Sequence, residues 1–588
     1  MPEEERASLK VVVLGGYGTF GRRLVELLSD EPRLTVVIAG RSVAKAEALR
    51  ASLPPGAAIE TMELDREGNI GPALAALDPD ILVDVTGPFQ AYGATPYRLA
   101  ETCLRLGVNY LDFSDGSDFT AGIARFDAEA RARGIFMLSA VSSAPALSGA
   151  AVRHLAAGLA SIETVEGGIA PSPFAGIGRN VIVAIASYAG RPLRLARDGQ
   201  PRTAYGLTET RRMTICPPGR LPLSSRRFVL VDVPDLALMP AMLPGLRSAW
   251  FGAGTAPQFY LGLLVLLARL ARYRLFPPLR LFTGLFHSVA NRLTWGERRG
   301  GMYVRLIGRD GEGRSVSRSW HLLAEGDAGP SVPAMAADAV IRRCLAGHPP
   351  EPGARHAAAA LDLADFARGF AARGIVTGTR QDGERSWPLY RRVLGAAWDE
   401  LPAPVRDLHR VETGRRFAGR ATVDRGRGFF AGLIGAFYRF PRAGSDIPVS
   451  VLLERSRGGE LWQRTFAGRT FRSFQREGEG RGACLVDERF GPVSVGLALV
   501  VGEGRLDYVV RRWSFLGIPM PVFMAPGGRT FEHVEGGLFR FHVEIDHPWF
   551  GLIVRYQGWL KDSDRDSEAQ SSMKFTANAS SADQSVSS

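Results

Sequence analysis

Residues 11–28 read VVVLGGYGTFGRRLVELL, and this stretch decides the fold. A run of branched apolar residues, typical of a buried strand, meets a cluster of glycines, after which apolar residues recur at helical spacing. Gly16, Gly18 and Gly21 match the pattern G-x-G-x-x-G directly after the strand and at the start of the helix, which is the context of a dinucleotide-binding turn. Such glycines permit a tight turn, a close approach of the backbone to a pyrophosphate, and packing of the helix on the strand.

The glycine cluster also fits a second spacing. Gly15, Gly18 and Gly21 fill the pattern G-x-x-G-x-x-G, so the sequence leaves open which glycine makes which contact. In either spacing the helix N-terminus presents unpaired N–H groups and the positive end of the helix dipole to the phosphates. We therefore predict that the cofactor contacts comprise the whole stretch Gly15, Gly16, Tyr17, Gly18, Thr19, Phe20 and Gly21.

The end of the second predicted strand indicates which dinucleotide binds. Gly40, Arg41 and Ser42 follow this strand, and no Asp or Glu occurs within 34–44. An acid at this place binds the ribose 2′-hydroxyl of NAD, whereas an arginine accommodates the 2′-phosphate of NADP. Arg41 and Ser42 therefore favour NADP(H). The alternative is that Arg41 is a solvated loop residue in an arginine-rich chain.

Two further strand ends carry candidate cofactor contacts. Asp65 follows the third predicted strand and could reach the adenine amine, although its position equally suits a helix cap or a turn residue. The fourth predicted strand leads into Thr86, Gly87 and Pro88. Because the carboxyl ends of strands face the ligand crevice in open sheets, we expect this turn to lie near the ribose and the nicotinamide.

Polar residues that follow these strands are the candidates for proton transfer beside the cofactor. They are Gln90, Tyr92, Asp112, Ser114, Asp115 and Asp118. No motif assigns a role to any of them, and Ser117 or Asp118 is equally suited to cap a helix that begins at FTAGIARF. The sequence therefore leaves the catalytic residue unidentified.

Apolar runs and helical patterns alternate over residues 8–145. The strand-like runs lie at 10–14, 34–39, 58–64, 81–86, 108–113 and 135–139, with helical patterns between them. Strands that alternate with helices of this length predict βαβ units. The fold class expected here is α/β, a doubly wound parallel sheet of the Rossmann type.

Four further segments are expected beyond this domain. Residues 146–346 mix helical and strand patterns, which predicts an α+β domain for substrate binding or dimerisation. The Pro- and Gly-rich segment 347–386 predicts a linker that contains a helix at 357–373. Residues 387–562 show short runs with period-two alternation, which predicts a mostly antiparallel β-rich domain, either a sheet or a barrel. The Ser- and Asp-rich end, 563–588, predicts a disordered tail.

Composition limits the class of protein. The chain has 588 residues, a formal charge of +12 and a pI of about 9.8, and nearly all of its positive charge is arginine. This bias is typical of a GC-rich genome, and the absence of a basic tract with interleaved aromatics argues against nucleic-acid binding. The 4 cysteines form no CxxC pair, which argues against a disulfide scaffold and a zinc site. The acidic start, MPEEERASLK, does not resemble a secretory signal, so we expect a cytoplasmic protein without a bound metal.

The segment 259–295 combines apolar and basic residues. Its run FYLGLLVLLA, at 259–268, is too short to span a bilayer, which requires about 20 residues. Arg269, Arg272 and Arg274 follow this run, so the segment suits a helix that lies peripherally on an anionic membrane surface. The alternative is a core or dimer-interface hairpin that is broken at the Pro-Pro pair.

Four blocks in the first 140 residues resemble a known family. GGYGTFG, AGRS, VTGPFQAYG at 85–93 and NYLDFSDG at 109–116 are together similar to the saccharopine dehydrogenase-like oxidoreductases. The segment GDAGPSVPA at 326–334, followed by a helix, is similar to the return helix of that family. The resemblance implies an NADP-linked Rossmann domain with an inserted α+β domain that often mediates dimerisation, and hence a homodimer.

The C-terminal part resembles a bacterial domain of unknown function that is found fused behind such oxidoreductases. The likeness lies in blocks such as RRFAGRATVDRG, ERFGPVSVGLALVV and IVRYQGWL. This second resemblance implies no activity, because none is assigned to that domain.

Two functional hypotheses follow from these patterns. The first is an NADP(H)-dependent oxidoreductase that transfers a hydride to or from a C=O, C=N or C=C group held over residues 86–92. Its substrate would be apolar or lipid-like, because the C-terminal strands carry many apolar faces. The second is a non-catalytic protein whose Rossmann domain senses NADP(H) and whose β-rich module binds a lipid or a partner. Turnover of NADPH separates the two.

Overall fold

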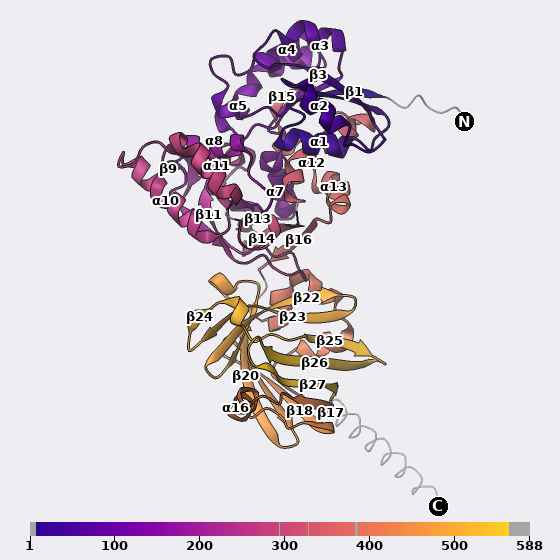
Figure 1. Ribbon diagram of the computed structural model, residues 1–588, viewed down its shortest axis with the longest axis vertical. Helices are drawn as coiled ribbons and strands as arrows, with labels where there is room; N and C mark the ends of the chain where they lie inside the picture. Colours follow the sequence, from indigo (N-terminus) through magenta and orange to yellow (C-terminus); the bar gives the residue numbers. More distant parts are fainter. Residues whose placement is uncertain (1–7, 293, 327, 383–385, 564–588) are drawn as a thin grey trace, which may run out of the picture. The chain divides into compact units, whose positions relative to one another are not determined.

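The computed structural model describes residues 8–292, 294–326, 328–382 and 386–563 (Figure 1). The chain divides into two compact units. The first unit comprises Met1–Ile215 and Arg226–Thr379, and the second comprises Cys216–Ser225 and Arg380–Ser588. The disordered tail that we expect at 563–588 lies outside the described residues except for Ser563.

The first unit contains the predicted doubly wound parallel sheet. Its 7 strands run in the order β15-β6-β5-β4-β1-β2-β3. Read from β3, the first six follow the order 3-2-1-4-5-6 of a dinucleotide-binding Rossmann fold. The strands are β1 (Leu9–Leu14), β2 (Leu34–Gly40), β3 (Ala58–Glu63), β4 (Ile81–Asp84), β5 (Asn109–Asp112), β6 (Phe136–Ser139) and β15 (Gly353–His356).

Helices connect these strands as the sequence predicts. Val11, Val12 and Val13 of β1 are fully buried, which explains why this strand reads as a continuous apolar run. The helical pattern between the strand-like runs 108–113 and 135–139 is broken into α5, a 3₁₀ turn and α6. The connecting helices are α1 (Thr19–Leu28), α2 (Val43–Arg50), α3 (Ile70–Leu77), α4 (Arg98–Leu106), α5 (Ser117–Gly122) and α6 (Asp127–Ala132).

A second, mixed sheet of 7 strands follows in the order β10-β11-β12-β7-β13-β14-β16. The long antiparallel pair of β13 and β14 joins β7, and β8 pairs separately with β9. The strands are β7 (Ser161–Ala170), β8 (Pro192–Arg197), β9 (Gln200–Tyr205), β10 (Thr210–Met213), β11 (Arg226–Leu230), β12 (Ser248–Gly254), β13 (Arg299–Arg309), β14 (Ser315–Glu325) and β16 (Val376–Gln381). The remaining helices of the first unit are α7 (Ser148–Ala156), α8 (Arg179–Ser187), α9 (Asp235–Met242), α10 (Gln258–Arg272), α11 (Thr283–Arg292), α12 (Val332–Leu345) and α13 (Ala367–Ala372).

The segment 347–386, which we expected to be a linker, is instead part of both sheets. β15 pairs in parallel with β6 and extends the first sheet, and β16 forms an edge of the second. The helix expected at 357–373 is reduced to two 3₁₀ turns and α13. Proline and glycine in this segment therefore bound short elements rather than a free connection.

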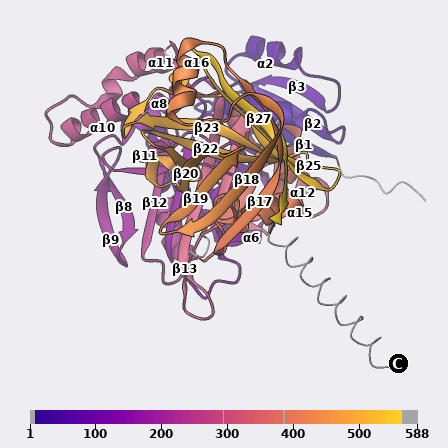
Figure 2. The same ribbon diagram turned by 90° about the horizontal axis from the view of Figure 1, so that it is seen from below.

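The second unit is an antiparallel β-barrel (Figures 1 and 2). An 11-stranded sheet runs in the order β22-β21-β20-β19-β18-β17-β27-β26-β25-β23-β24, and an additional pairing of β22 with β23 closes the ring. Closure leaves no long exposed strand edge in the ring. The strands are β17 (Gly414–Arg425), β18 (Gly444–Ser456), β19 (Gly459–Phe466), β20 (Arg469–Glu477), β21 (Val486–Phe490), β22 (Val493–Gly502), β23 (Arg505–Phe515), β24 (Ile518–Met520), β25 (Thr530–Glu535), β26 (Leu538–His547) and β27 (Gly551–Asp562).

Three α-helices accompany the barrel strands in the described part of this unit. They are α14 (Leu389–Leu394), α15 (Ala403–His409) and α16 (Phe429–Phe437). α14 contacts β20, α15 contacts β25 and β26, and α16 lies against β27. The segment Cys216–Ser225 also belongs to this unit, because Val501 N donates a hydrogen bond to Gly219 O at 2.8 Å.

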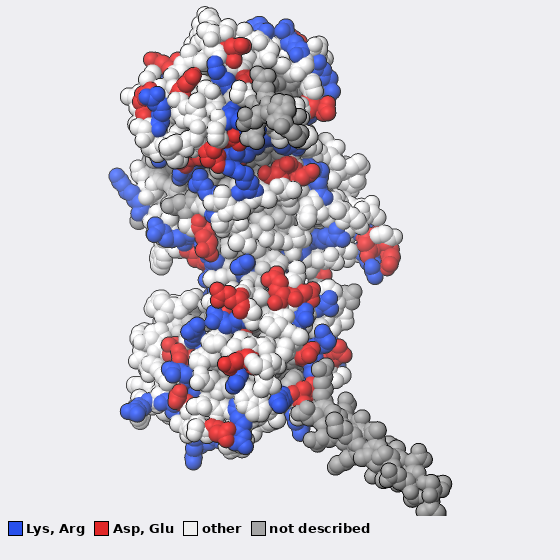
Figure 3. Space-filling view, turned by 90° about the vertical axis from the view of Figure 1, so that its right-hand side faces the viewer, with Lys and Arg blue, Asp and Glu red and all other residues white. Residues whose placement is uncertain are grey.

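The described helices include none that is both long enough and apolar enough to cross a membrane. On the face shown in Figure 3, Lys and Arg side chains are interspersed with Asp and Glu. On that face the positive charge of the chain is therefore distributed rather than gathered into one basic patch.

Candidate functional site

The glycine turn connects β1 to α1. Gly15 has a φ of +85°, a left-handed conformation that strains residues with a side chain. A Cβ on Gly16 would lie 2.9 Å from Val13 O and 3.0 Å from Ile38 Cγ2, so this glycine lets the turn lie against β2. Gly15 therefore makes the tight turn that the motif requires.

The start of α1 lies close against this turn. A Cβ on Gly21 would lie 2.8 Å from Gly16 Cα, closer than real Cβ contacts allow. Gly18 is the N-cap of α1 and has no side chain to cover the helix terminus. The first N–H groups of α1, from Thr19 onward, are thus presented as they are in phosphate-binding helices.

Tyr17 of the glycine turn contacts the end of β2. Its hydroxyl accepts a hydrogen bond from Ser42 N at 2.9 Å, and a Cβ on Gly40 would lie 2.7 Å from its ring. The backbone of Arg41 is therefore held beside the turn while its side chain is exposed. Tyr17 shapes the place where a 2′-phosphate would bind Arg41.

Asp65 is a turn residue. Its carboxylate accepts a hydrogen bond from Glu67 N at 3.1 Å, and its carbonyl accepts one from Gly68 N at 2.9 Å. The side chain is exposed after the edge strand β3. These are the contacts of a turn residue, which the sequence left open as the alternative to a contact with adenine. The contact of Asp65 with adenine stays a prediction.

The turn after β4 lies beside the glycine turn. A Cβ on Gly15 would lie 3.2 Å from Val85 C and 3.3 Å from Thr86 Cα. The two turns therefore meet between β1 and β4, where the strand order reverses. Open α/β sheets bind their ligands at this switch point.

A buried network holds Thr86. Asp84 Oδ1 accepts hydrogen bonds from Thr86 N at 3.0 Å and Thr86 Oγ1 at 2.7 Å. The Tyr92 hydroxyl lies 2.7 Å from Thr86 Oγ1 and donates to Asp84. The Arg66 guanidinium stacks 3.3 Å from the centroid of the Tyr92 ring, and its Nε lies 3.8 Å from Asp84 Oδ2. Burial raises the pKa of Asp84, and burial together with the Asp84 charge raises the pKa of Tyr92, so Tyr92 keeps its proton.

The start of α8 adds residues that the sequence analysis missed. Asn180 Nδ2 donates hydrogen bonds to Thr86 O at 3.3 Å and Gly87 O at 3.1 Å. Gly178, the N-cap of α8, approaches the first residue of α1, because a Cβ on it would lie 2.8 Å from that threonine's hydroxyl. The start of α8 therefore contacts both turns. The glycine-rich text GIGRN at 176–180 was the available signal.

Asp112 and Ser114 do not face the crevice, contrary to our expectation. Both are fully buried. Asp112 Oδ1 accepts hydrogen bonds from Ser114 N, Ser139 Oγ and Ala140 N, at 2.9, 2.9 and 2.8 Å, and so joins the ends of β5 and β6. Burial raises the pKa of Asp112 to about 7. Its role is to hold the strand ends together.

The other proton-transfer candidates are at the surface or in the Thr86 network. Gln90 Nε2 donates to Asp115 Oδ1 at 2.9 Å, and both residues are exposed, as is Asp118. The N-cap of α5 is Gly116, not Ser117 or Asp118 as the sequence suggested. Of the candidates, Tyr92 is the one in contact with the turn after β4.

The two turns at the switch point define a Rossmann domain of the dinucleotide-binding class. More particularly, residues 11–138 match the family model of the saccharopine dehydrogenase NADP binding domain. Residues 401–560 match a domain of unknown function, DUF4166. Both resemblances seen in the sequence are thereby confirmed, and the first unit has an oxidoreductase-type fold.

Comparison with solved structures finds similar chains at low sequence identity. One is saccharopine dehydrogenase (L-Glu forming) from Saccharomyces cerevisiae, at 11% identity over 64% of this chain and 100% of that chain, with a TM-score of 0.46. Another is KijD10, a 3-ketoreductase from Actinomadura kijaniata in complex with NADP and TDP-benzene, at 13% identity over 58% of this chain and 91% of that chain, with a TM-score of 0.27. No curated protein matches the chain significantly in sequence.

Proposed function

We propose that the protein is an NADP(H)-dependent oxidoreductase that acts on an apolar or lipid-like substrate. The observation that carries this proposal is the glycine turn, Gly15–Gly21, with the exposed Arg41 held beside it. Glycines cost conformational entropy on folding, and binding of a pyrophosphate at the turn would offset that cost.

The residues of both turns suit NADP(H). The N–H groups at the start of α1 would hold the pyrophosphate, Arg41 and Ser42 the 2′-phosphate, and Thr86–Pro88 the ribose beside the nicotinamide. When bound, NADP(H) supplies or accepts a hydride. The protein itself holds the turn after β4 in position, because Asp84 and the protonated Tyr92 both form hydrogen bonds with Thr86.

The oxidoreductase proposal is tested by isotope transfer. We expect deuterium from NADPH labelled at C4 to appear in product when the full chain is incubated with a panel of long-chain aldehydes, ketones, imines and enones. Mass spectrometry of the products detects the transfer. NADPH that binds without transfer to any member of the panel would favour the second hypothesis, a cofactor sensor or scaffold.

We also propose that the segment 259–295 contacts an anionic membrane surface. Eight of its large apolar side chains are exposed, with Leu275 at 73% and Trp295 at 74%, although others such as Leu261 are buried. The segment contains no Asp or Glu, so its charge complements anionic headgroups. Arg269 makes an intramolecular contact instead, because its guanidinium donates a hydrogen bond to Thr208 O at 3.0 Å.

Charge reversal at two exposed arginines tests this membrane contact. The variant Arg274→Glu/Arg280→Glu should bind vesicles that contain phosphatidylglycerol at least about tenfold more weakly, because each arginine near such a surface contributes about 1 kcal/mol. Flotation measures the bound fraction. Arg194→Glu/Arg202→Glu, on β8 and β9, is the matched control and should bind normally. If the charge reversal leaves vesicle binding unchanged, the membrane proposal fails, and a dimer in light scattering would instead assign the segment to a dimer interface.

A further inference from the structure

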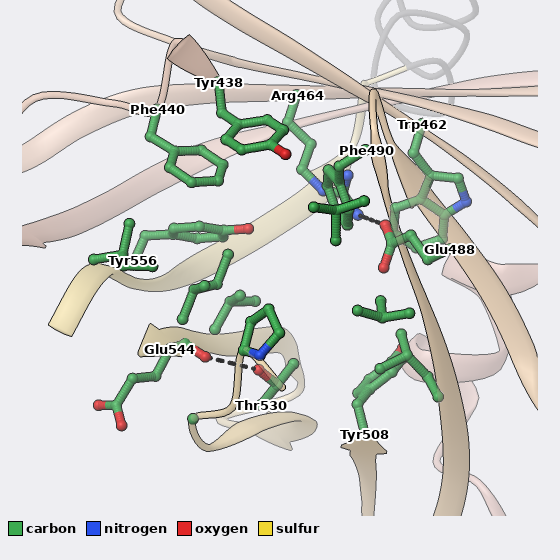
Figure 4. Close-up of a pocket in the computed structure, with 18 of the residues that line it drawn as sticks. Tyr438, Phe440, Trp462, Arg464, Glu488, Phe490, Tyr508, Thr530, Glu544 and Tyr556 are labelled. Carbon is green, nitrogen blue, oxygen red and sulfur yellow. Dashed lines mark hydrogen bonds and ion pairs between the residues drawn. The ribbon is translucent and has the colours of Figure 1, made fainter. Parts of the chain in front are cut away.

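The barrel encloses an apolar cavity of about 690 Å³ (Figure 4). This volume falls within the range of small-molecule sites, about 300–1,000 Å³. The walls are aliphatic and aromatic, as Figure 4 shows for Phe440, Phe490 and Tyr556. Apolar walls of this kind favour apolar ligands over water.

One end of this cavity is closed. Because the barrel strands are antiparallel, their connections alternate between the two ends. α14 closes the end at which β19 begins and β20 finishes: Leu389 N lies 3.4 Å from Glu460 Oε1, and the Tyr390 hydroxyl donates to Gln475 Oε1 at 2.9 Å. Tyr390 lines the cavity and is fully buried.

The opposite end is open. It carries α16 and the connections at 467–468, 491–492, 516–529 and 548–550. Leu433 and Phe437 of α16 line the cavity and are nevertheless 58% and 67% exposed, so the cavity reaches solvent beside this helix.

Exposed apolar side chains gather at this open end. In the described part of the second unit, every large apolar residue that is strongly exposed lies there. We call this set the collar, and it comprises Phe429, Phe430, Leu433, Phe437, Phe515, Leu516, Ile518, Val522, Phe523 and Trp549. Exposed apolar patches of this kind mark sites where a ligand or an apolar phase is met.

The charged side chains of the cavity wall have partners within the protein. Arg464 lies 3.3 Å from Glu488 Oε1, and Ser473 Oγ bridges the two at 2.8 and 2.6 Å. Glu532 Oε2 lies 2.6 Å from His409 Nε2. Because these charged groups already have hydrogen-bond partners, a ligand inside the barrel need not carry a charge to pair with them.

We propose that the barrel binds one single-chain lipid, with its hydrocarbon chain along the cavity and its polar end at the collar. The hydrocarbon chain of the lipid would fill the void and contact the cavity wall. The polar end of the lipid would stay in water, so its burial would cost no desolvation energy. This site is independent of the cofactor chemistry of the first unit, so its test requires no NADPH.

Binding of a neutral fluorescent probe tests the site directly. N-phenyl-1-naphthylamine should bind the full chain at one site, with a rise in fluorescence. Hexadecanol and palmitate should both displace the probe, whereas octanol should require at least tenfold higher concentration, because a shorter chain buries fewer methylenes. Absence of probe binding would overturn the proposal. Displacement by palmitate but not by hexadecanol would overturn the placement of the polar end at the collar.

Variants on β18 locate the probe in the cavity. Val451 is buried and lines the cavity, whereas its neighbour Leu452 is half-buried and points outward. Val451→Trp should reduce the affinity for the probe at least tenfold, and Leu452→Trp should leave it unchanged. Val495→Trp, on β22, repeats the test in case one variant fails to fold, which circular dichroism detects. Equal binding by all three variants would place the probe outside the barrel.

Three collar residues that do not line the cavity test the entrance. The variant Phe429→Glu/Phe523→Glu/Trp549→Glu should slow the transfer of a pyrene-labelled fatty acid from phosphatidylcholine vesicles to the protein at least tenfold. Without the apolar collar, the acyl chain of the fatty acid would have to cross water before it enters the cavity. Affinity for the monomeric naphthylamine probe should stay unchanged. Normal transfer by this variant would show that the collar is not the entrance.

Discussion

Alanine in place of Gly21 is expected to weaken the binding of NADPH strongly. The added Cβ would lie 2.8 Å from Gly16 Cα, so either α1 must move away from the turn or the turn must open. Overpacking of this kind typically costs about 1–3 kcal/mol of stability. The same displacement moves the helix N-terminus away from the pyrophosphate, so we expect the affinity to fall about 100-fold or more.

NADPH fluorescence and thermal unfolding measure the two effects of Gly21→Ala separately. Gly262→Ala, in α10, is the control, because a Cβ there would meet open space. The control should bind NADPH normally. Normal NADPH binding by Gly21→Ala would show that the close contact of α1 with the turn does not serve the cofactor.

Alanine in place of Arg41 is expected to remove the preference for NADPH over NADH. A hydrogen bond to a charged group contributes about 1.5–3 kcal/mol, so the affinity for NADPH should fall by about 10- to 100-fold. The affinity for NADH should change little, because that cofactor has no 2′-phosphate. Tyr17 and Ser42 should keep the loop in place, since their hydrogen bond does not involve the Arg41 side chain.

Arg50→Ala provides the matched control for the Arg41 variant. Arg50 is an exposed arginine at the C-terminal end of α2, whereas Arg41 lies just before the start of this helix. Arg50→Ala therefore removes one positive charge, as Arg41→Ala does, but away from the glycine turn. Its NADPH affinity should equal that of the unchanged protein. If Arg50→Ala and Arg41→Ala weaken NADPH equally, a general loss of charge would explain the effect, and Arg41 would not be the 2′-phosphate ligand.

Local sequence patterns predicted most of the Rossmann sheet. Most of its first six strands are short apolar runs between turn residues, and burial on both faces makes such runs continuous, whereas the edge strand β3 is partly exposed and contains Glu60 and Glu63. The glycine turn and Arg41 were likewise visible, because the residues that form them are adjacent in sequence. Asn180 was not, because its contact with Thr86 depends on how a later domain folds back.

The barrel was only partly visible in the sequence. The alternating apolar signal of β17 and β20 is weak, because several of their inward positions hold small or polar residues, such as Ala421, Ser473 and Gln475. β15 and β16 were read as a linker because they are short and lie among prolines and glycines. The cavity could not be predicted, since it arises from inward residues of strands that are far apart in the chain.

The most direct test of the central claim is a calorimetric titration of the unchanged protein with NADPH and with NADH. We expect one NADPH site per chain and an affinity for NADH at least about tenfold lower, because Arg41 and no acid lies at the end of β2. If neither cofactor gives a heat of binding, or if the protein binds both with equal affinity, the proposed NADPH site is contradicted.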